Sequence, residues 1–430
     1  MKNFFYSSFL LSFFFLLFYP TVIKAEVIER RRLQLGDASV SSGYAFFPIF
    51  FNLPGAGKAY GFLGYLNNIY ESPVSAYGTV ITGDFNGHVL GITNIPIYKK
   101  YLRMDPFNVH FTKSSLKTYN QRGMDSDRND YNIINADYLD ILGIRLTASF
   151  WERRFEIYSV FYKNQFSIDS IADKNGKKTA SYSNRKKRTA NTNQSGVSFD
   201  FTDDKSDPRK GLAVDFSPKA QEKRNPTDAN YTVLDINLTG YIPVLSYSTV
   251  ALNYYHSQVV MQKKGELDRQ KLIDQYGLNC SALKDQVAKN ACERDVEKII
   301  QAQIAENKYG TAGSLGGISR LRSFDEGRFK GSIVEFVGAE LRWNLSQDPV
   351  PFNIFLAKDV RTELQLAFFY ERGSVADSNV DLWKKSAFSY GTGIRIITAS
   401  GFIYRFDVAN GNEGKNFTFF IDYPWGNFRG

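Results

Sequence analysis

Apolar and polar residues alternate along most of the chain. Between Leu142 and Phe150 every second residue is apolar, and glycine, arginine, threonine and serine fill the positions between them. The same period of two recurs at 197–202, 388–396 and 402–408. Successive side chains of a β-strand point to opposite faces, so each segment predicts a strand with one apolar and one polar face. An aromatic-rich face opposite arginine, aspartate and glycine, repeated in strand after strand, is typical of strands that cross a membrane.

Sixteen such segments can be placed along the chain, and an even number is expected of a closed antiparallel barrel. They are 44–52, 58–70, 76–84, 88–98, 105–113, 139–150, 153–165, 195–203, 210–217, 230–241, 247–261, 332–345, 361–372, 386–397, 401–409 and 416–425. In hydrocarbon every backbone N–H and C=O must be paired, which only a closed sheet achieves. We therefore predict an all-β fold, a 16-stranded antiparallel transmembrane β-barrel over residues 44–425.

The connections between these strands sort by parity. Those after odd-numbered strands include every very long one, whereas those after even-numbered strands are mostly tight, apart from 346–360. The very long connections are 114–138, 166–194, 218–229 and 262–331. Outer-membrane barrels carry long loops outside and short turns on the periplasmic side. Both termini are therefore expected on the periplasmic side.

The first 25 residues differ from the rest. Lys2 precedes an apolar run over 4–19, then Pro20, and Ala25 is a small residue suited to cleavage. This pattern predicts a secretory signal peptide, 1–25, and the alternative is an N-terminal membrane anchor. A short periplasmic segment, 26–43, would follow, and 426–430 would form a C-terminal tail.

Composition narrows the class of protein. Aromatic residues make up 15% of the chain, which excludes a disordered chain. No later apolar run reaches about 18 residues, which excludes a polytopic helical membrane protein. The formal net charge is +9, and seven basic residues lie in the loop 166–194. They could contact lipopolysaccharide phosphates or form a solvated loop. No nucleic-acid-binding fold accompanies the charge, so no nucleic acid is expected as a partner.

The stretch 262–310 departs from alternation and has helical spacing with charged faces, so we expect a helical insertion in an extracellular loop. Cys280 and Cys292, the two cysteines of the chain, both lie in it. In an exported protein they are expected to form a local disulfide, and two unpaired thiols are the alternative. The histidines, His88, His110 and His256, are scattered, so no metal site and no cofactor are expected.

A motif follows this insertion. It reads GGISRLRSFDEGRFKG from Gly316 to Gly331 and precedes a strand containing GAELRWNL. It resembles the loop-six region of the BamA/TamA superfamily of outer-membrane barrels, the bacterial surface antigen family. The matching residues are Gly316, Gly317, Leu321, Arg322, Ser323, Phe324, Gly327 and Arg328, with Ser323 where the family has glycine. Three further segments resemble family motifs in the same order: DFTDDKSDPRKG, FFYERGSV and YRFDVANG.

The resemblance implies that loop six folds back into the lumen and that its arginine pairs with carboxylates of the wall. Carried to this chain, the arginine is Arg322 and the carboxylates are Glu371 and Asp407. The alternative is that these charges fill a wet lumen without organised contact. Many family members carry periplasmic polypeptide-transport-associated domains before the barrel, and fewer than twenty residues separate Ala25 from the first expected strand. We therefore expect a member that lacks those domains.

Three functions stay open at this stage. The resemblance implies assembly, insertion or translocation of outer-membrane proteins through a weak lateral seam between the first and last strands. The alternatives are a plugged or passive pore or lipid-handling barrel, and a surface antigen or adhesin. The sequence contains no nucleophile elbow, P-loop or paired-histidine motif, so an enzyme is not expected. Expected partners are outer-membrane lipids and lipopolysaccharide, with unfolded outer-membrane proteins or periplasmic accessory proteins under the first function.

Overall fold

A computed structural model describes residues 42–425, apart from 56, 182–186, 222–224, 226, 246, 277–279, 281–284, 346–350 and 399–402. The expected signal peptide, most of the segment 26–43 and the tail 426–430 lie outside the described residues.

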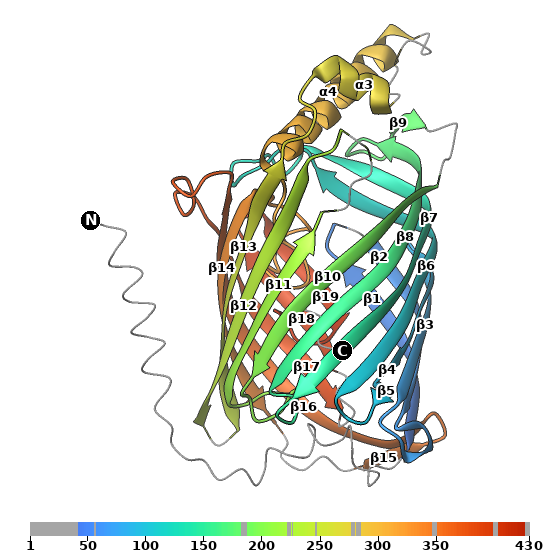
Figure 1. Ribbon diagram of the computed structural model, residues 1–430, viewed down its shortest axis with the longest axis vertical. Coiled ribbons are helices and arrows are strands. Elements are labelled where there is room, and N and C mark those ends of the chain that lie inside the picture. Colours follow the sequence, from blue (N-terminus) through green and yellow to red (C-terminus); the bar gives the residue numbers. More distant parts are fainter. Residues whose placement is uncertain are drawn as a thin grey trace, which may run out of the picture.

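The described residues form one antiparallel sheet that closes into a 16-stranded barrel, as the alternation predicted (Figure 1). Sixteen wall positions arise from nineteen segments because β5 continues β4 along β6, while β9 and β15 are short additions to β8 and β16. The strands are β1 (Gly43–Leu53), β2 (Gly57–Asn67), β3 (Ser75–Gly83), β4 (Asn86–Thr93), β5 (Ile95–Tyr98), β6 (Leu102–Tyr119), β7 (Tyr131–Phe150), β8 (Phe155–Ala172), β9 (Lys178–Ser181), β10 (Arg188–Asp200), β11 (Gly211–Ala220), β12 (Asn230–Leu245), β13 (Ser248–Lys263), β14 (Ile333–Asn344), β15 (Pro351–Ile354), β16 (Ala357–Ala376), β17 (Ala387–Thr398), β18 (Ile403–Gly411) and β19 (Gly414–Ile421). A 3-10 turn, η1 (Ile69–Glu71), follows β2.

Side-chain exposure follows the alternation. Large apolar residues such as Phe62 (67% exposed) and Leu142 (60%) face outward, whereas their strand neighbours face the lumen. Thr147 and Ser149 of β7, for example, are buried on the lumen side. The wall therefore presents an apolar outer surface and a polar inner one, as a barrel in lipid requires.

Several strand boundaries differ from those predicted. β6, β7 and β8 have 18, 20 and 18 residues, so most of the expected loops 114–138 and 166–194 is strand. Crossing a membrane takes only about 9–11 residues. Beyond the membrane both faces of a strand contact water, so the extended parts of β6 to β8 show no alternation of apolar and polar residues. The expected strand 88–98 is interrupted at Asn94, whose φ of 61° breaks the pleat between β4 and β5.

The end of the chain differs most. The sequence predicted a closing strand that reaches residue 425, but β19 ends at Ile421. At Asp422 φ is 85°, and its N–H donates to the carbonyl of Ile403 at 2.7 Å. Tyr423 and Trp425 are consequently buried inside the barrel. In a strand continued to residue 425 both side chains would lie on the face of Phe417, which points outward, so the turn at Asp422 moves them inward.

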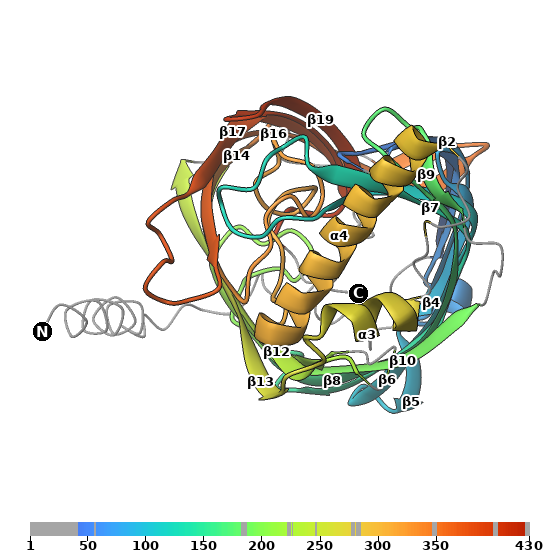
Figure 2. The same cartoon turned by 90° about the horizontal axis from the view of Figure 1, so that it is seen from above.

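The connection from β13 to β14 contains α3 (Arg269–Tyr276) and α4 (Gln286–Tyr309), within the insertion expected at 262–310. Seen from above, α4 crosses the mouth of the barrel (Figure 2). The expected disulfide between Cys280 and Cys292 is confirmed. Neither helix of the described chain is long and apolar enough to cross a membrane. The part of the connection that follows α4, residues 310–332, is called loop six below.

Candidate functional site: a loop anchored inside the barrel beside an incomplete seam

Loop six is folded back on itself by backbone hydrogen bonds. Leu315 and Phe329 exchange N–H to carbonyl bonds of 3.0 and 2.9 Å. Gly316 and Gly317 have φ of 105° and 110°, and a Cβ on Gly316 would lie 2.2 Å from the carbonyl oxygen of Asp325. Glycine alone adopts this conformation without strain. The double glycine of the motif therefore makes the narrow neck of the loop.

The apolar residues of the motif pack as a core inside the barrel. Leu321, Phe324 and Phe329 are buried in one cluster with Tyr255 of β13 and Phe336 of β14. The rings of Phe324 and Phe329 meet edge to face with centroids 5.1 Å apart. Burying an aromatic side chain contributes about 1.5–3 kcal/mol. The loop is therefore part of the folded interior.

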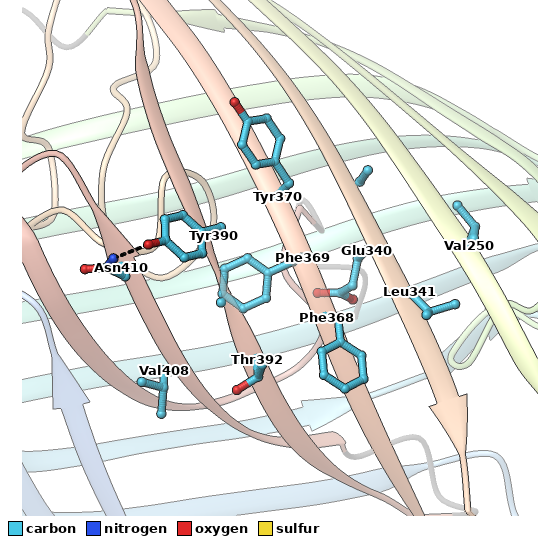
Figure 3. A pocket seen from close by; sticks show the side chains of 12 residues that line it. Val250, Glu340, Leu341, Phe368, Phe369, Tyr370, Tyr390, Thr392, Val408 and Asn410 are labelled. Carbon is cyan, nitrogen blue, oxygen red and sulfur yellow. Dashed lines mark hydrogen bonds between the residues drawn. The ribbon is translucent and has the colours of Figure 1, made fainter.

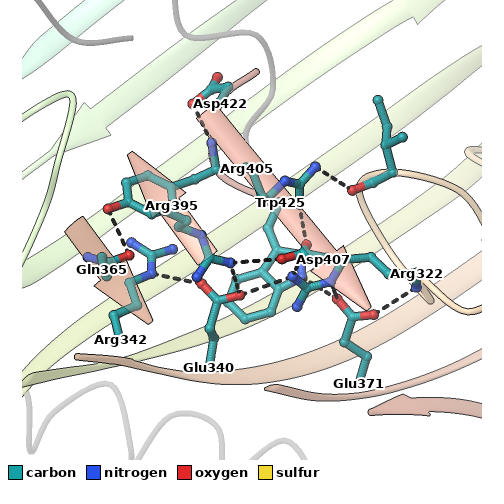
Figure 4. A network of polar contacts seen from close by, with 12 residues as sticks. Arg322, Glu340, Arg342, Gln365, Glu371, Arg395, Arg405, Asp407, Asp422 and Trp425 are labelled. Carbon is teal, nitrogen blue, oxygen red and sulfur yellow. Dashed lines mark hydrogen bonds and ion pairs between the residues drawn. The ribbon is translucent and has the colours of Figure 1, made fainter. Parts of the chain in front are cut away.

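The three charged residues singled out by sequence meet in the lumen (Figure 4). The backbone N–H and Nε of Arg322 each donate to a Glu371 carboxylate oxygen at 2.9 Å, and its Nη1 donates to Asp407 at 2.8 Å. The guanidinium also lies 3.4 Å from the ring centre of Phe369. Arg322, Glu371 and Asp407 are fully buried. Their ion pairs are therefore formed out of contact with bulk water.

Sequence reasoning did not assign a role to one carboxylate of this site that pairs with three arginines. Glu340 of β14 accepts from Arg395 at 2.7 Å, Arg342 at 2.8 Å and Arg322 at 3.1 Å. Arg405 completes the set, 3.4 Å from Asp407. Four arginines thus surround three carboxylates, and all seven are at most 1% exposed. Alternation within GAELRWNL could have placed Glu340 in the lumen, because its neighbours Leu341 and Trp343 face outward.

Ser323, which stands where the resembled family has glycine, bonds to the wall. Its N–H donates to Ser389 Oγ at 3.1 Å, and the two hydroxyl oxygens lie 2.6 Å apart. A Cβ on Gly411 of β18 would come within 2.2 Å of Ser323 Oγ. The serine is therefore accommodated by a glycine of the opposing strand.

The end of the chain joins the same site. Trp425 Nε1 donates to Glu371 at 3.0 Å, and the Trp425 carbonyl accepts from Asn237 of β12 at 2.8 Å. The indole contacts Phe336, with ring centroids 6.3 Å apart. The residues after β19 are thereby tied to the far wall of the barrel and to the loop-six anchor.

A second anchor lies nearer the mouth. Arg328 donates to both carboxylate oxygens of Glu413, at 2.7–3.0 Å, and to Ser126 Oγ at 2.6 Å. Gly327, with φ of 65°, precedes it. Glu413 lies in the turn between β18 and β19. Loop six is therefore attached to the hairpin that closes the barrel.

The same loop also reaches the other side of the closure. Asp325 accepts from Lys117 Nζ and from Tyr119 Oη, both at 2.8 Å, and the N–H of Glu326 donates to the carbonyl of Pro54 at 2.9 Å. Pro54 follows β1. Burial raises the pKa of the Glu326 carboxyl, although the Ile318 N–H that donates to it acts in the opposite direction. Loop six thus bridges β1 and β19 at their outer ends.

Very little backbone pairing connects β1 to β19, and we call the facing edges of these two strands the seam. One residue pair, Asn52 with Phe419, links β1 to β19 in the described chain, and the Asn52 amide donates to the Phe417 carbonyl. By contrast, β1 and β2 share eleven pairs, and β18 and β19 share eight. Because β19 ends at Ile421, it does not extend along most of the β1 edge.

Pro48 is one reason in the sequence for the small number of pairs between β1 and β19. The Phe46 N–H points away from β2, since it donates to the Leu356 carbonyl at 2.8 Å. In an antiparallel strand this direction alternates by residue, so position 48 also faces the seam. Proline has no N–H to donate, and within sheets it is confined to such edges. The β1 edge therefore lacks one donor in its middle.

A second ionic cluster lies near the turn from β10 to β11. Glu156 accepts from Arg103 at 2.7 Å, from Arg153 at 2.8 Å, and from Lys205. Burial, together with the charge of Arg153, lowers the pKa of Lys205 to about 7. Sequence reasoning did not identify this cluster, which brings together residues of two strands, β6 and β8, and of two connections, β7–β8 and β10–β11.

The outer wall opposite the anchor is hollowed by a groove of about 540 Å³ (Figure 3). Phe368, Tyr370 and Tyr390 flank it, and Gly391 widens it. A Cβ on Gly391 would lie 2.7 Å from the ring of Phe369, the residue that contacts Arg322. The wall is therefore thin between the groove and the anchor. Within the described residues, no group of three or more His, Cys, Asp or Glu is placed to hold a metal ion.

In sequence the chain matches no family model and no curated protein. Among solved structures it is similar to BamA from Haemophilus ducreyi lacking POTRA domains 1–3, with 12% identity, 89% of this chain and 69% of that chain covered, and a TM-score of 0.44. It is similar to CdiB from Acinetobacter baumannii (12% identity, 89% and 60% covered, TM-score 0.47) and to CdiB from Escherichia coli (10%, 88% and 62%, TM-score 0.49). The chain spans less than two thirds of the length of both CdiB chains.

Proposed function

We propose that the chain is an exported barrel of the bacterial outer membrane, a member of the BamA/TamA superfamily that assists the insertion or translocation of other outer-membrane polypeptides. Its substrates would be unfolded polypeptides that form β-strands, and its surroundings outer-membrane lipids and lipopolysaccharide. The single pair between β1 and β19 is the observation that carries this proposal.

An unpaired strand edge is a template for another strand. In a barrel whose other wall strands share long ladders, the seam is the place where such a strand can enter at the lowest cost. The residues beside it are held by loop six, through the Arg328 side chain at Glu413 and the Glu326 N–H at Pro54, and these contacts can be released without unfolding the wall. This arrangement favours a gate over a permanently closed cylinder.

The wall is also short beside the seam. β18 and β19 have 9 and 8 residues and β3 has 9, at the lower limit of the about 9–11 residues with which a strand crosses a membrane. A membrane protein with a short apolar span thins the bilayer around it. A thinned bilayer lowers the barrier to an entering strand, which supports the same function.

Two measurements test the proposal together. Depleting the protein should lower the abundance of other outer-membrane barrels. A seam locked by Asn52→Cys with Phe419→Cys, a facing pair within disulfide reach, should fail to restore that abundance until it is reduced. The matched control is Val408→Cys with Phe417→Cys, a facing pair inside the regular β18–β19 ladder, which should restore it. Unchanged barrel levels on depletion would reject the assembly role.

A plugged pore is the second candidate, because loop six fills part of the lumen and α4 crosses the mouth. Planar-bilayer conductance with unchanged barrel levels on depletion would favour it.

A further inference from the structure

The part of the β1 edge that β19 does not reach is covered by a segment distant in the same chain. Tyr44 pairs with Lys358 and Ala45 with Ala357, at the start of β16. The Phe46 N–H donates to the Leu356 carbonyl at 2.8 Å. These contacts continue the antiparallel pairing of β1 on the edge opposite β2.

This contact is not between neighbours in the wall. Along the barrel, β17, β18 and β19 separate β16 from β1. Residues 351–361, β15 with the start of β16, form a hairpin that pairs with itself from Pro351 and Arg361 to Ile354 and Ala357. We call it the capping hairpin. Figure 1 shows β15 at the bottom of the barrel, at the end opposite the helices.

The attachment of the capping hairpin to β1 is small. It consists of two residue pairs, the bond from Phe46, and a bond of 3.5 Å from the Tyr44 hydroxyl to the Phe355 carbonyl. Phe355 at its tip is 93% exposed, and Leu356 is 47% exposed. The hairpin thus covers backbone groups of β1 without burying its own tip. A segment held in this way can be displaced while β16 keeps its ladders with β14 and β17.

We propose that the capping hairpin is a built-in competitor for the β1 edge, which occupies in the resting barrel the backbone groups that an incoming extended polypeptide would pair with. The hairpin then sets the threshold for substrate entry: a strand that offers more backbone bonds than the hairpin replaces it. This inference rests on the proposed function for its biological meaning, but the competition itself can be measured on the purified barrel.

The test uses the full chain in detergent micelles, with Phe50→p-benzoylphenylalanine as a photocrosslinker on the open part of the edge. The probe is a biotinylated peptide with the sequence of β19, GKNFTFFI. In one variant residues 352–360 are replaced by Asn-Gly, which closes the paired positions Pro351 and Arg361 with a two-residue turn. In a second variant, Ala45→Cys with Ala357→Cys locks the hairpin to β1 at a facing pair.

Removal of the hairpin should raise peptide capture at least fivefold, and the oxidised lock should lower capture below wild type until it is reduced. The reduced lock is its own folding control, and heat-modifiable mobility on gels checks the deletion. Equal capture by the oxidised and reduced lock, or by wild type and a folded deletion variant, would overturn the inference. Increased capture with unchanged barrel levels on depletion would keep the competition and reject the assembly function. Reduced barrel levels on depletion with unchanged capture would keep the assembly function and reject the competition.

Discussion

Arg322 carries its charge in a place from which water is excluded. Three carboxylates compensate it, and the stacked ring of Phe369 covers one face of the guanidinium. The planar fork of arginine suits two carboxylates at once, whereas a lysine ammonium is a point charge. Glu371 has Arg322 as its one arginine partner among the described contacts, so it loses most when this charge is removed, whereas Glu340 keeps Arg342 and Arg395.

We expect Arg322→Ala to destabilise the barrel by about 3–5 kcal/mol, because it leaves Glu371 and Asp407 buried without a full set of partners. Arg322→Lys should lose less. Urea unfolding in micelles and heat-modifiable mobility on gels measure both. Arg128→Ala, at an exposed arginine of the β6–β7 connection, is the matched control and should have little effect. A stable Arg322→Ala barrel would mean that the pairs do not hold loop six.

Lys205 predicts a pH dependence. Its pKa of about 7 in the folded protein lies below the ordinary value near 10.5, so the unfolded chain binds more protons between these values. Stability should therefore rise with pH across this window, by about 2 kcal/mol from pH 7 to pH 9. Lys205→Met should flatten this rise, measured as urea midpoints at both pH values. An equally steep rise in the variant would assign the effect to other groups.

At the scale of elements, the features that could be predicted from the sequence are those with a local pattern of alternation or spacing. The lipid-facing strands, the helical stretch around Cys280 and Cys292, and the motif around Arg322 all have local patterns. The upper parts of β6 to β8 do not, because strands with two wet faces show no apolar period. The inward turn at Asp422 and the capping hairpin depend on contacts between distant residues, which no local pattern reports.

The helix α4 predicts a two-layered closure of the lumen. It is held over the mouth by Lys298 with Asp130 at 2.7 Å and by Glu306 with Tyr231 at 3.1 Å, while loop six lies below it. The N–H of Gly265 donates to the Asn307 carbonyl at 3.0 Å, so Gly-Ser can replace residues 266–306. This deletion alone should raise planar-bilayer conductance slightly, and more when combined with Arg322→Ala. Cys280→Ser with Cys292→Ser keeps the helices and should leave conductance unchanged. A large conductance from the deletion alone would show that loop six does not close the lumen.

At the scale of the whole molecule, the barrel is closed across the seam by three different devices. Loop six joins both sides at the outer end, Asn52 pairs with Phe419 close to that end, and the capping hairpin covers β1 at the inner end. Elsewhere the backbone ladder performs this task. Each device uses different residues, so each can be altered separately and its contribution to closure measured.

Glu413→Gln removes the carboxylate charge to which Arg328 donates in the turn before β19, and it leaves the backbone pairing of the strands intact. The lost charge-assisted bonds cost about 1.5–3 kcal/mol, so amide hydrogen exchange in β1 and β19 should accelerate by at least about tenfold. Exchange in β12 and β13, far from the seam, should stay as in wild type, as read by mass spectrometry of peptides from each strand. Arg128→Gln is the control, because exposed Arg128 donates only to the backbone carbonyl of Glu413, at 3.1 Å, among its described contacts. Equal acceleration in all four strands would mean that Glu413 stabilises the barrel as a whole. Acceleration confined to β1 and β19 would identify loop six as the outer latch of the seam.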